Sequence, residues 1–249
     1  MTESIGQEFM RRTRYPELSP SPKEVGIIPQ PPLELPVRTG AELIALPDPG
    51  KIVVPPLDLR TAIEERRTLR KYAETALTLD ELTYLLWISQ GVKRISSQPS
   101  TARNVPSAGA RHAFETYLLV NRVNGLQPGL YHYLAIENQL ELITIRPDIN
   151  AVITTACREQ SHVANSAVTF LWVAVVERMF WRYVERGYRY MHLDAGHVCQ
   201  NLALGAQQLG CGICPIAAYD DDLLNQALGL NGKDLFVIYL ASLGKRIEK

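Results

Sequence analysis

The sequence predicts an α+β fold in which helices flank a mostly antiparallel sheet. Helix and strand patterns alternate along the chain without the regular strand–helix–strand repeat of a doubly wound sheet. Asn124-Gly125 and Glu137-Asn138 follow strand patterns, as hairpin turns do. The apolar run at 167–176 has the length and the valine and aromatic content of a buried central strand. Together these features favour an α+β sandwich.

Capping residues mark two helix starts. Asp58 is a suitable N-cap for a short helix, and residues 78–81 form a capping box before a longer one that ends at Gly91. A third helix is expected over 191–209, with Gly210 as its stop. The side chains expected to face inward are Leu59, Ala62 and Ile63, then Leu82, Leu85, Leu86 and Ser89, then Leu193, Val198, Leu202, Ala206 and Leu209.

The remaining elements are shorter. The patterns predict strands over 116–123, 130–134, 139–145, 167–176 and 235–241, helices over 148–158, 179–183 and 220–228, and a loop over 92–112. Prolines recur through residues 1–55 and exclude a long helix or a central strand there. We therefore expect a proline-rich extended N-terminal arm at 1–55, either disordered or wrapped around a partner subunit, and a folded domain at 56–249.

Composition excludes several classes of protein. With 26 basic and 26 acidic side chains the formal net charge is zero, so nucleic-acid or membrane-surface binding is not expected. No apolar run reaches the roughly 18 residues of a membrane span, and the N-terminus does not resemble a signal peptide. The four cysteines do not suggest an exported disulfide scaffold, so a cytoplasmic protein is expected. No GxGxxG, Walker or HExxH motif occurs, and no metal is expected.

The first candidate for chemistry is the run Arg66, Arg67, Thr68, Leu69, Arg70. On an extended segment Arg66, Thr68 and Arg70 project to one side, where two guanidiniums and a hydroxyl suit a phosphate monoester. A solvated basic helix end is the alternative. Lys245 and Arg246 near the C-terminus add two cations that either close on the same phosphate or form a solvated tail.

Three further segments are candidates. The run PSAGAR at 106–111 has small residues that let a backbone approach a flat ligand, or it is a plain loop. Residues 210–220 contain Cys211 and Cys214, and a loop lining a cofactor is favoured there over a redox dithiol. In the aromatic segment 180–190, most rings are expected in the core or an interface, but Tyr183 and Tyr188 are the candidates to meet substrate.

Taken in order, these segments resemble the nitroreductase-like FMN superfamily, and within it the SagB-type or McbC-like dehydrogenase branch. The matching stretches begin at Arg66 (RRTLRKY), Pro106 (PSAGARHAFETYLLV), Gly129 (GLYHY), Tyr188 (YRYMHLDAGHVCQNLALGAQQLG) and Phe236 (FVIYLASLGKR), and cover 57–246. The resemblance implies an α+β nitroreductase-like fold, an intertwined homodimer and FMN at the subunit interface.

The same resemblance implies roles for residues. Those expected to bind FMN are Arg66, Arg67, Thr68 and Arg70, the loop Pro106, Ser107, Ala108 and Gly109 (often donated by the other subunit), the segment Pro215, Ile216, Ala217 and Ala218 near flavin N5, and Lys245 and Arg246. Three departures stand out. Ala113 replaces a frequent proline, Ala217-Ala218 replaces a Glu-Gly pair, and Arg182-Tyr183 replaces the Lys-Tyr pair of azoline oxidases.

Three functions are compatible with these residues. The first is an FMN-dependent oxidoreductase that moves hydride between NAD(P)H, or a reduced substrate, and an organic acceptor. The second is a partner-dependent azoline dehydrogenase that acts on a peptide-bound heterocycle. Because arginine is not a neutral base near pH 7, azoline proton abstraction is disfavoured, although Tyr183 remains a proton donor or acceptor. The third is a non-catalytic flavin-binding subunit that organises partners through its arm.

Overall fold

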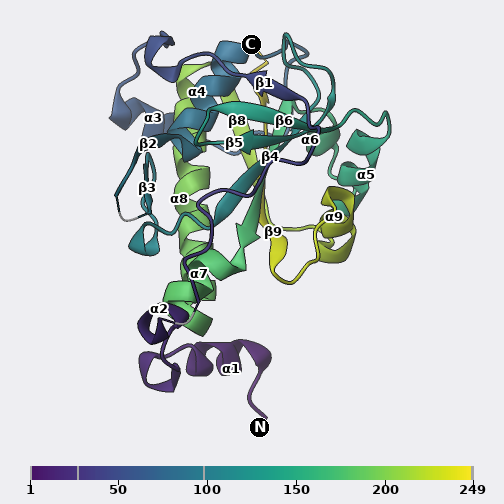
Figure 1. Ribbon diagram of the computed structural model, residues 1–249. Helices are drawn as coiled ribbons and strands as arrows, with labels where there is room; N and C mark the ends of the chain where they lie inside the picture. The colour runs from purple at the N-terminus through teal and green to yellow at the C-terminus, as the bar shows by residue number, and fades with distance from the viewer. Residues whose placement is uncertain (1, 27, 98, 248–249) are drawn as a thin grey trace.

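The computed structural model describes residues 2–26, 28–97 and 99–247. Seven strands form one antiparallel sheet in the order β1-β6-β5-β4-β7-β9-β8 (Figure 1), which confirms the predicted α+β class. Its strands are β1 (Leu43–Ala45), β4 (Phe114–Val120), β5 (Gly129–Leu134), β6 (Gln139–Thr144), β7 (Val168–Val175), β8 (Cys211–Ile216) and β9 (Leu235–Lys245). β7 lies inside the sheet with every residue buried, as its composition predicts.

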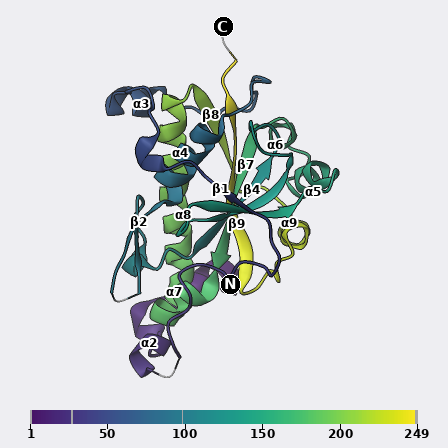
Figure 2. The same ribbon diagram turned by 45° about the horizontal axis from the view of Figure 1, so that its top comes forward.

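Helices cover both faces of this sheet. Those of the described chain are α1 (Ile5–Arg12), α2 (Pro22–Val25), α3 (Leu59–Glu65), α4 (Leu79–Gln90), α5 (Ile149–Ala156), α6 (Ser161–Ala164), α7 (Val176–Tyr183), α8 (Gly187–Gln208) and α9 (Asp221–Leu228). Figure 2 shows α4 and α8 on one face and α5, α6 and α9 on the other. The predicted N-caps hold, because Asp58 accepts from the Thr61 N–H and Thr78 and Glu81 form a complete capping box.

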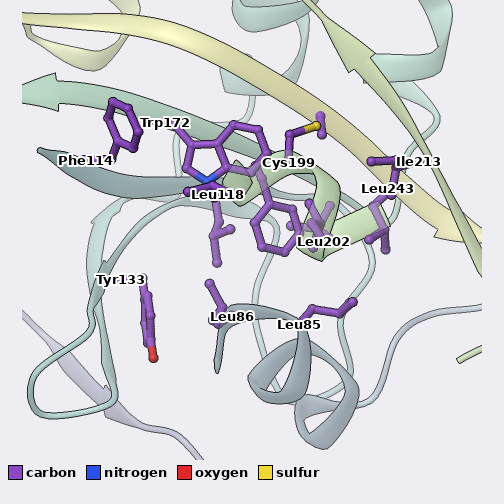
Figure 3. Close-up of a cluster of buried hydrophobic side chains, with 14 of the residues drawn as sticks. Leu85, Leu86, Phe114, Leu118, Tyr133, Trp172, Cys199, Leu202, Ile213 and Leu243 are labelled. Carbon is purple, nitrogen blue, oxygen red and sulfur yellow. The ribbon is translucent and has the colours of Figure 1, made fainter. Parts of the chain in front are cut away.

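The alternation of side chains along the central strands divides the core in two. From β7, Phe170 and Trp172 point to the α4–α8 side, whereas Leu171 and Val173 point to the α5–α9 side. Figure 3 shows the first core, where Trp172 lies above Leu86 of α4 and near Cys199 of α8. Because both faces are buried, the strand reads as a continuous apolar run.

Several local predictions were wrong. The segment 92–112 contains a hairpin, β2 (Val92–Ile95) with β3 (Thr101–Arg103), and a 3-10 turn at Ala108–Ala110. Most of the expected cofactor loop at 210–220 is β8, which pairs with β9. Leu59, Ile63 and Leu193 do not face inward, since they are 64%, 54% and 62% exposed. The other inward predictions are buried or half-buried.

The proline-rich segment lies against its own chain. The backbone carbonyl of Ile28 accepts from Trp181, and that of Pro32 accepts from Arg178 at 2.8 Å. Further along, the Leu35 N–H donates to Glu115 and Arg38 pairs with Glu141 at 2.8 Å. The edge strand β1 then pairs with β6. Residues 28–45 therefore run from the end of α7 past Glu115 of β4 to β6.

Candidate active site

The arginine-rich segment, residues 66–73, lies against β8 and β9 at one edge of the sheet. The Leu69 N–H donates to the Ile213 carbonyl at 2.8 Å, and the Ala73 N–H donates to that of Lys245 at 2.9 Å. Gly212 and Gly244 face each other across these strands. A Cβ atom on Gly212 would lie 2.4 Å from Leu69 Cδ1, and one on Gly244 would lie 2.7 Å from Tyr72 Cγ. The two glycines therefore make the room that this segment occupies.

The segment presents cations without carboxylate partners. Arg66 is half-buried, whereas Arg67, Thr68 and Arg70 are exposed. No ion pair of the three arginines is formed within the residues that the structure describes. Arg70 lies beside the Cys214 thiol. Burial raises the pKa of this thiol, and the Arg70 guanidinium partly opposes that rise. Unpaired guanidiniums on a fixed backbone suit an anionic ligand.

The two C-terminal cations lie on the same strands but already have protein acceptors. Lys245 pairs with Glu81 and donates to the Leu209 carbonyl at 2.8 Å. Arg246 donates to the Cys211 carbonyl at 3.1 Å and to Gln207. Both line an open hollow of about 990 Å³ that Tyr72–Thr75 also border. In the strand register Lys245 lies opposite Cys211, whereas Arg70 lies beside Cys214, which is opposite Ser242. Lys245 is therefore three residues, or about 10 Å along the strand, from the level of Arg70.

A hydrogen-bond network joins this segment to the end of β8. Tyr72 Oη lies 2.8 Å from both the Leu69 carbonyl and Ser242 Oγ, and Ser242 Oγ lies 3.0 Å from His162 Nδ1. Gln160 donates its amide to the Ala218 carbonyl at 2.7 Å, which turns its Oε1 toward His162 Nε2 at 3.2 Å. His162 Nε2 must then carry a proton and Nδ1 must accept from Ser242.

Burial and the nearby charge of Arg70 both lower the pKa of His162, which favours this neutral form of the ring. The network therefore connects the arginine-rich segment to Ala217 and Ala218. Both alanines are exposed, and their N–H groups donate to no acceptor in the described part of the chain. Sequence reasoning missed Gln160, His162 and Ser242, because nothing in their spacing indicates that they meet.

Cys211 and Cys214 are not placed to act together as a redox pair. Cys211 and Cys214 are both buried and both free. They are three residues apart on a strand, so their side chains point to opposite faces of the sheet. Burial raises the pKa of the Cys211 thiol to about 12, which disfavours the reactive thiolate. The structure thus contradicts the redox-dithiol alternative.

The loop at 106–109 lies at the opposite end of α8. The Ala108 N–H faces the Asp194 carboxylate near the start of that helix, at 3.3 Å. Arg246 instead contacts Gln207, near the helix C-terminus. Asp194 and Gln207 are 13 positions apart, which corresponds to about 20 Å of helix. One chain therefore keeps the loop apart from Arg246, and no hydrogen bond joins the loop to residues 66–70 in the described chain.

The aromatic candidates lie at the loop end of α8. Tyr183 is half-buried, and its ring meets Tyr190 edge-on at 4.9 Å between centroids. A Cβ atom on Gly109 would lie 2.4 Å from Tyr183 Oη, so the loop and this tyrosine are close neighbours. Tyr188 packs against the first core, and burial raises the pKa of its phenol. Of the two tyrosines, Tyr183 is thus the one beside the loop.

Two other features are absent from the described residues. No cluster of three or more histidine, cysteine, aspartate or glutamate side chains is arranged to hold a metal ion. No helix there is long and apolar enough to cross a membrane. The arginine-rich segment, the 217–218 backbone and the 106–109 loop therefore remain the candidate functional residues.

These features define an α+β protein with an exposed basic segment on one sheet edge. Comparison with known proteins identifies the family to which it belongs. The model of the nitroreductase family matches residues 63–245, and the chain belongs to that family. It is therefore an oxidoreductase of the nitroreductase superfamily.

Individual relatives are of two kinds. A nitroreductase homologue from Methanocaldococcus jannaschii is 30% identical over 205 residues, which cover 82% of this chain and 97% of that protein. The trifolitoxin-processing protein TfxB of Rhizobium leguminosarum bv. trifolii is 29% identical over 167 residues, 62% of this chain and 44% of TfxB. The microcin B17-processing protein McbC of Escherichia coli is 25% identical over 53% of this chain and 50% of McbC.

Solved structures confirm the fold. A nitroreductase homologue from Ralstonia eutropha matches with a TM-score of 0.70 at 24% identity, over 90% of this chain and 97% of its own. A chain of the Escherichia coli microcin synthetase McbBCD complex, bound to truncated pro-MccB17, matches with a TM-score of 0.58 at 19% identity. This match covers 98% of this chain and 92% of the other. The family model that matches residues 63–245 confirms the resemblance to the nitroreductase-like superfamily, and these structures confirm its fold.

Proposed function

We propose that this protein is an FMN-dependent oxidoreductase that exchanges hydride between NAD(P)H, or a reduced substrate, and an organic acceptor. The observation that carries the proposal is the arginine-rich segment, which is held on the facing glycines of β8 and β9 and whose guanidiniums have no carboxylate partner in the described chain. A phosphate that is nearly a dianion matches Arg66, Arg67 and Arg70. The exposed N–H groups of Ala217 and Ala218 suit the edge of a planar ring.

The protein's own groups would act by binding and orientation. The chemistry that FMN supplies when bound is hydride transfer. Arg66, Arg67 and Arg70 would neutralise the phosphate, with Lys245 and Arg246 joining only if they leave their present acceptors. No carboxylate stands at Ala217-Ala218, so a nicotinamide or another substrate would meet an uncharged backbone there. Tyr183, which lies beside the loop at 106–109, is the first candidate to hold or move a proton, and Tyr188 is the second.

We infer further that the working unit is a homodimer. The loop at 106–109 lies about 20 Å along α8 from Arg246, and it makes no hydrogen bond to residues 66–70 within the described chain, so one complete site would take the loop of a second copy. Leu59, Ile63 and Leu193 are exposed apolar side chains on α3 and α8, and apolar surface of this kind is typical of a subunit interface. The proposed site would then lie between two subunits.

The first experiment is an anaerobic titration of the purified protein. FMN is expected to copurify, and its absorbance is expected to bleach when NADH or NADPH is added. Unchanged absorbance with both nucleotides would count against NAD(P)H as the donor. Protein that binds no FMN even when FMN is added would overturn the proposal itself.

A second function is favoured by the resemblance to two peptide-processing proteins and to a chain of the McbBCD complex. In this case the protein would be a partner-dependent dehydrogenase of a peptide-bound azoline. The same titration separates the two functions. Flavin that resists NAD(P)H, but is reduced by an azoline-containing peptide when partner proteins are present, would favour the second.

The shared site predicts complementation between two defective variants. Arg66→Gln removes a proposed phosphate ligand, and Gly109→Val distorts the loop because Gly109 has φ +58° and no room for a side chain. Each variant alone is expected to bind FMN weakly. When the two are coexpressed, mixed dimers contain one intact site, so flavin retention should recover to about one FMN per mixed dimer. If recovery is absent in isolated mixed dimers, the two elements do not form one site across subunits.

A further inference from the structure

A second cavity lies between the N-terminal arm and the end of α7. It has a volume of about 390 Å³ and is lined by arm residues 15, 18–21 and 24 and by residues 182–184 and 186, and we call it the arm cavity. Figure 1 shows α1 and α2 of the arm beside α7, away from the end of the molecule that carries the C-terminus. The arm cavity is thus separate from the arginine-rich segment.

Two arginines bring unneutralised charge to the arm cavity. Arg182 donates from Nη1 to the Gly109 carbonyl at 3.3 Å, and Arg186 donates to Tyr190 Oη at 2.8 Å and to the Thr13 carbonyl at 2.9 Å. All these acceptors are neutral groups. Neither guanidinium pairs with a carboxylate anywhere in the described ranges. Each arginine keeps further N–H groups available for a ligand.

Aromatic rings hold these guanidiniums in place. The Arg186 guanidinium lies 4.5 Å from the ring centroid of Tyr15 and 5.5 Å from that of Tyr190. The Arg182 guanidinium lies 5.4 Å from the ring centroid of Tyr183. A cation already fixed by stacking loses little side-chain freedom when it binds an anion.

The one carboxylate on the cavity wall is directed at its own segment. Glu24 accepts from the Ser21 N–H at 2.8 Å and from Ser21 Oγ at 2.9 Å, which completes the cap of α2. With Arg182 and Arg186 the wall carries a net charge of about +1, from two cations and one anion. That balance matches a single carboxylate better than a phosphate dianion.

The backbone beside the tyrosine is strained. Val184 has φ +42° and ψ −134° and is buried, a conformation that β-branched residues rarely adopt. This strain brings the end of α7 and the following turn onto the same cavity, with Tyr183 between the two arginines. Such strained residues cluster where a ligand is bound.

We propose that the arm cavity binds a monocarboxylate with an apolar body, either a small organic acid or the C-terminal carboxylate of a peptide. The carboxylate would accept hydrogen bonds from Arg182 and Arg186, and the apolar body would lie against Tyr15, Leu18 and Val184. Because Arg182 also holds the Gly109 carbonyl, an occupied cavity would adjoin the loop at 106–109. The site does not depend on FMN.

Calorimetric titration of the full chain tests this proposal with four probes: benzoate, the dipeptide Gly-Phe, its C-terminal amide and inorganic phosphate. We expect benzoate or Gly-Phe to bind and the amide and phosphate to bind at least about tenfold more weakly. Binding of benzoate alone identifies a small acid, and tighter binding of Gly-Phe identifies a peptide C-terminus. Equal binding of the acid and the amide, or preference for phosphate, would overturn the proposal.

Three variants locate the site. Arg182→Gln should raise the Kd of the bound probe at least about tenfold, whereas Arg12→Gln, an exposed arm arginine outside the cavity, should leave it unchanged. Leu18→Trp should block binding by filling the cavity while keeping both charges. If Arg182→Gln and Leu18→Trp both bind the probe like the unaltered protein, while remaining folded by circular dichroism, the carboxylate is bound elsewhere.

Discussion

Glu115→Gln is expected to lower the free energy of unfolding by about 3–5 kcal/mol, because it removes one charge from a buried ionic network. Glu115 is 3% exposed on β4. It accepts from His132 Nε2 at 2.8 Å and also pairs with the buried Arg178. The glutamine would leave those two cations without their shared counter-charge.

The same network ties the arm to the sheet. His132 Nδ1 lies 3.2 Å from Glu141, which pairs in turn with Arg38 of the arm, and the Leu35 N–H donates to Glu115. Since both ring nitrogens of His132 face carboxylates, both must donate, and the ring is an imidazolium. We therefore expect Glu115→Gln to loosen residues 32–38 as well, seen as faster amide hydrogen exchange there.

The pH dependence of this stability has two sides. Burial opposes protonation of His132, but the hydrogen bonds and charges of Glu115 and Glu141 raise its pKa in the fold. Its contribution is therefore complete below the ordinary value of about 6.5 and is lost as pH rises through the raised pKa. Burial likewise opposes ionisation of Glu115, but His132 and Arg178 lower its pKa to about 2. That contribution is present above about 4.5 and is lost as pH falls toward 2.

Urea unfolding from pH 2 to 9 measures both effects. The difference between the unaltered protein and Glu115→Gln should be largest between about pH 4.5 and 6.5 and should shrink as pH rises through the raised His132 pKa. Glu64→Gln is the matched control, because Glu64 pairs with Arg60 at the surface, where an ion pair contributes at most about 1 kcal/mol. A loss for Glu115→Gln no larger than that of the control would contradict the network's role.

Periodicity and capping predicted much of the fold, because they are local properties. The capping box at Thr78 and the buried run of β7 were readable from neighbouring residues alone. The same periodicity assigned Leu59, Ile63 and Leu193 to the core, and they are exposed. An apolar stripe shows that a helix face avoids water and does not show what covers it. A subunit interface would produce the same pattern.

β8 was missed because its residues are poor strand formers. Gly212 and Pro215 both disfavour strands when judged by composition. The position of β8 is decided by its pairing with β9 and by the contacts of Gly212 with Leu69 and of Gly244 with Tyr72. Each of these glycine contacts joins residues more than 140 positions apart in the sequence. β8 is also an edge strand of the sheet, where a proline is tolerated.

The candidate site was predicted as a set of segments and not as a geometry. Each segment has a local composition that suits phosphate or a flat ring, so each was visible in the sequence. Which segments meet depends on the 22-residue length of α8, which separates Ala108 from Arg246. The network of His132, Glu115 and Arg178 was missed for a similar reason, since three charged residues on separate elements leave no common motif.

Gly244→Ala is expected to destabilise the protein by about 1–3 kcal/mol and to lower FMN retention with it. The new Cβ atom would lie 2.7 Å from Tyr72 Cγ and 2.8 Å from Tyr72 Cβ, too close for either to stay. Tyr72 cannot simply rotate, because its hydroxyl is held at the Leu69 carbonyl and at Ser242. The ring would have to move together with the backbone that carries Arg70.

Gly6→Ala is the matched control for this substitution. Gly6 lies on α1 with nothing within 4 Å of an added Cβ, so alanine there should stabilise the helix by up to about 1 kcal/mol. Urea unfolding and the absorbance of bound flavin would be measured on both variants. Unchanged stability of Gly244→Ala would mean that Tyr72 does not occupy the space above Gly244. Lost stability with full flavin retention would instead mean that the position of the arginine-rich segment does not govern FMN binding.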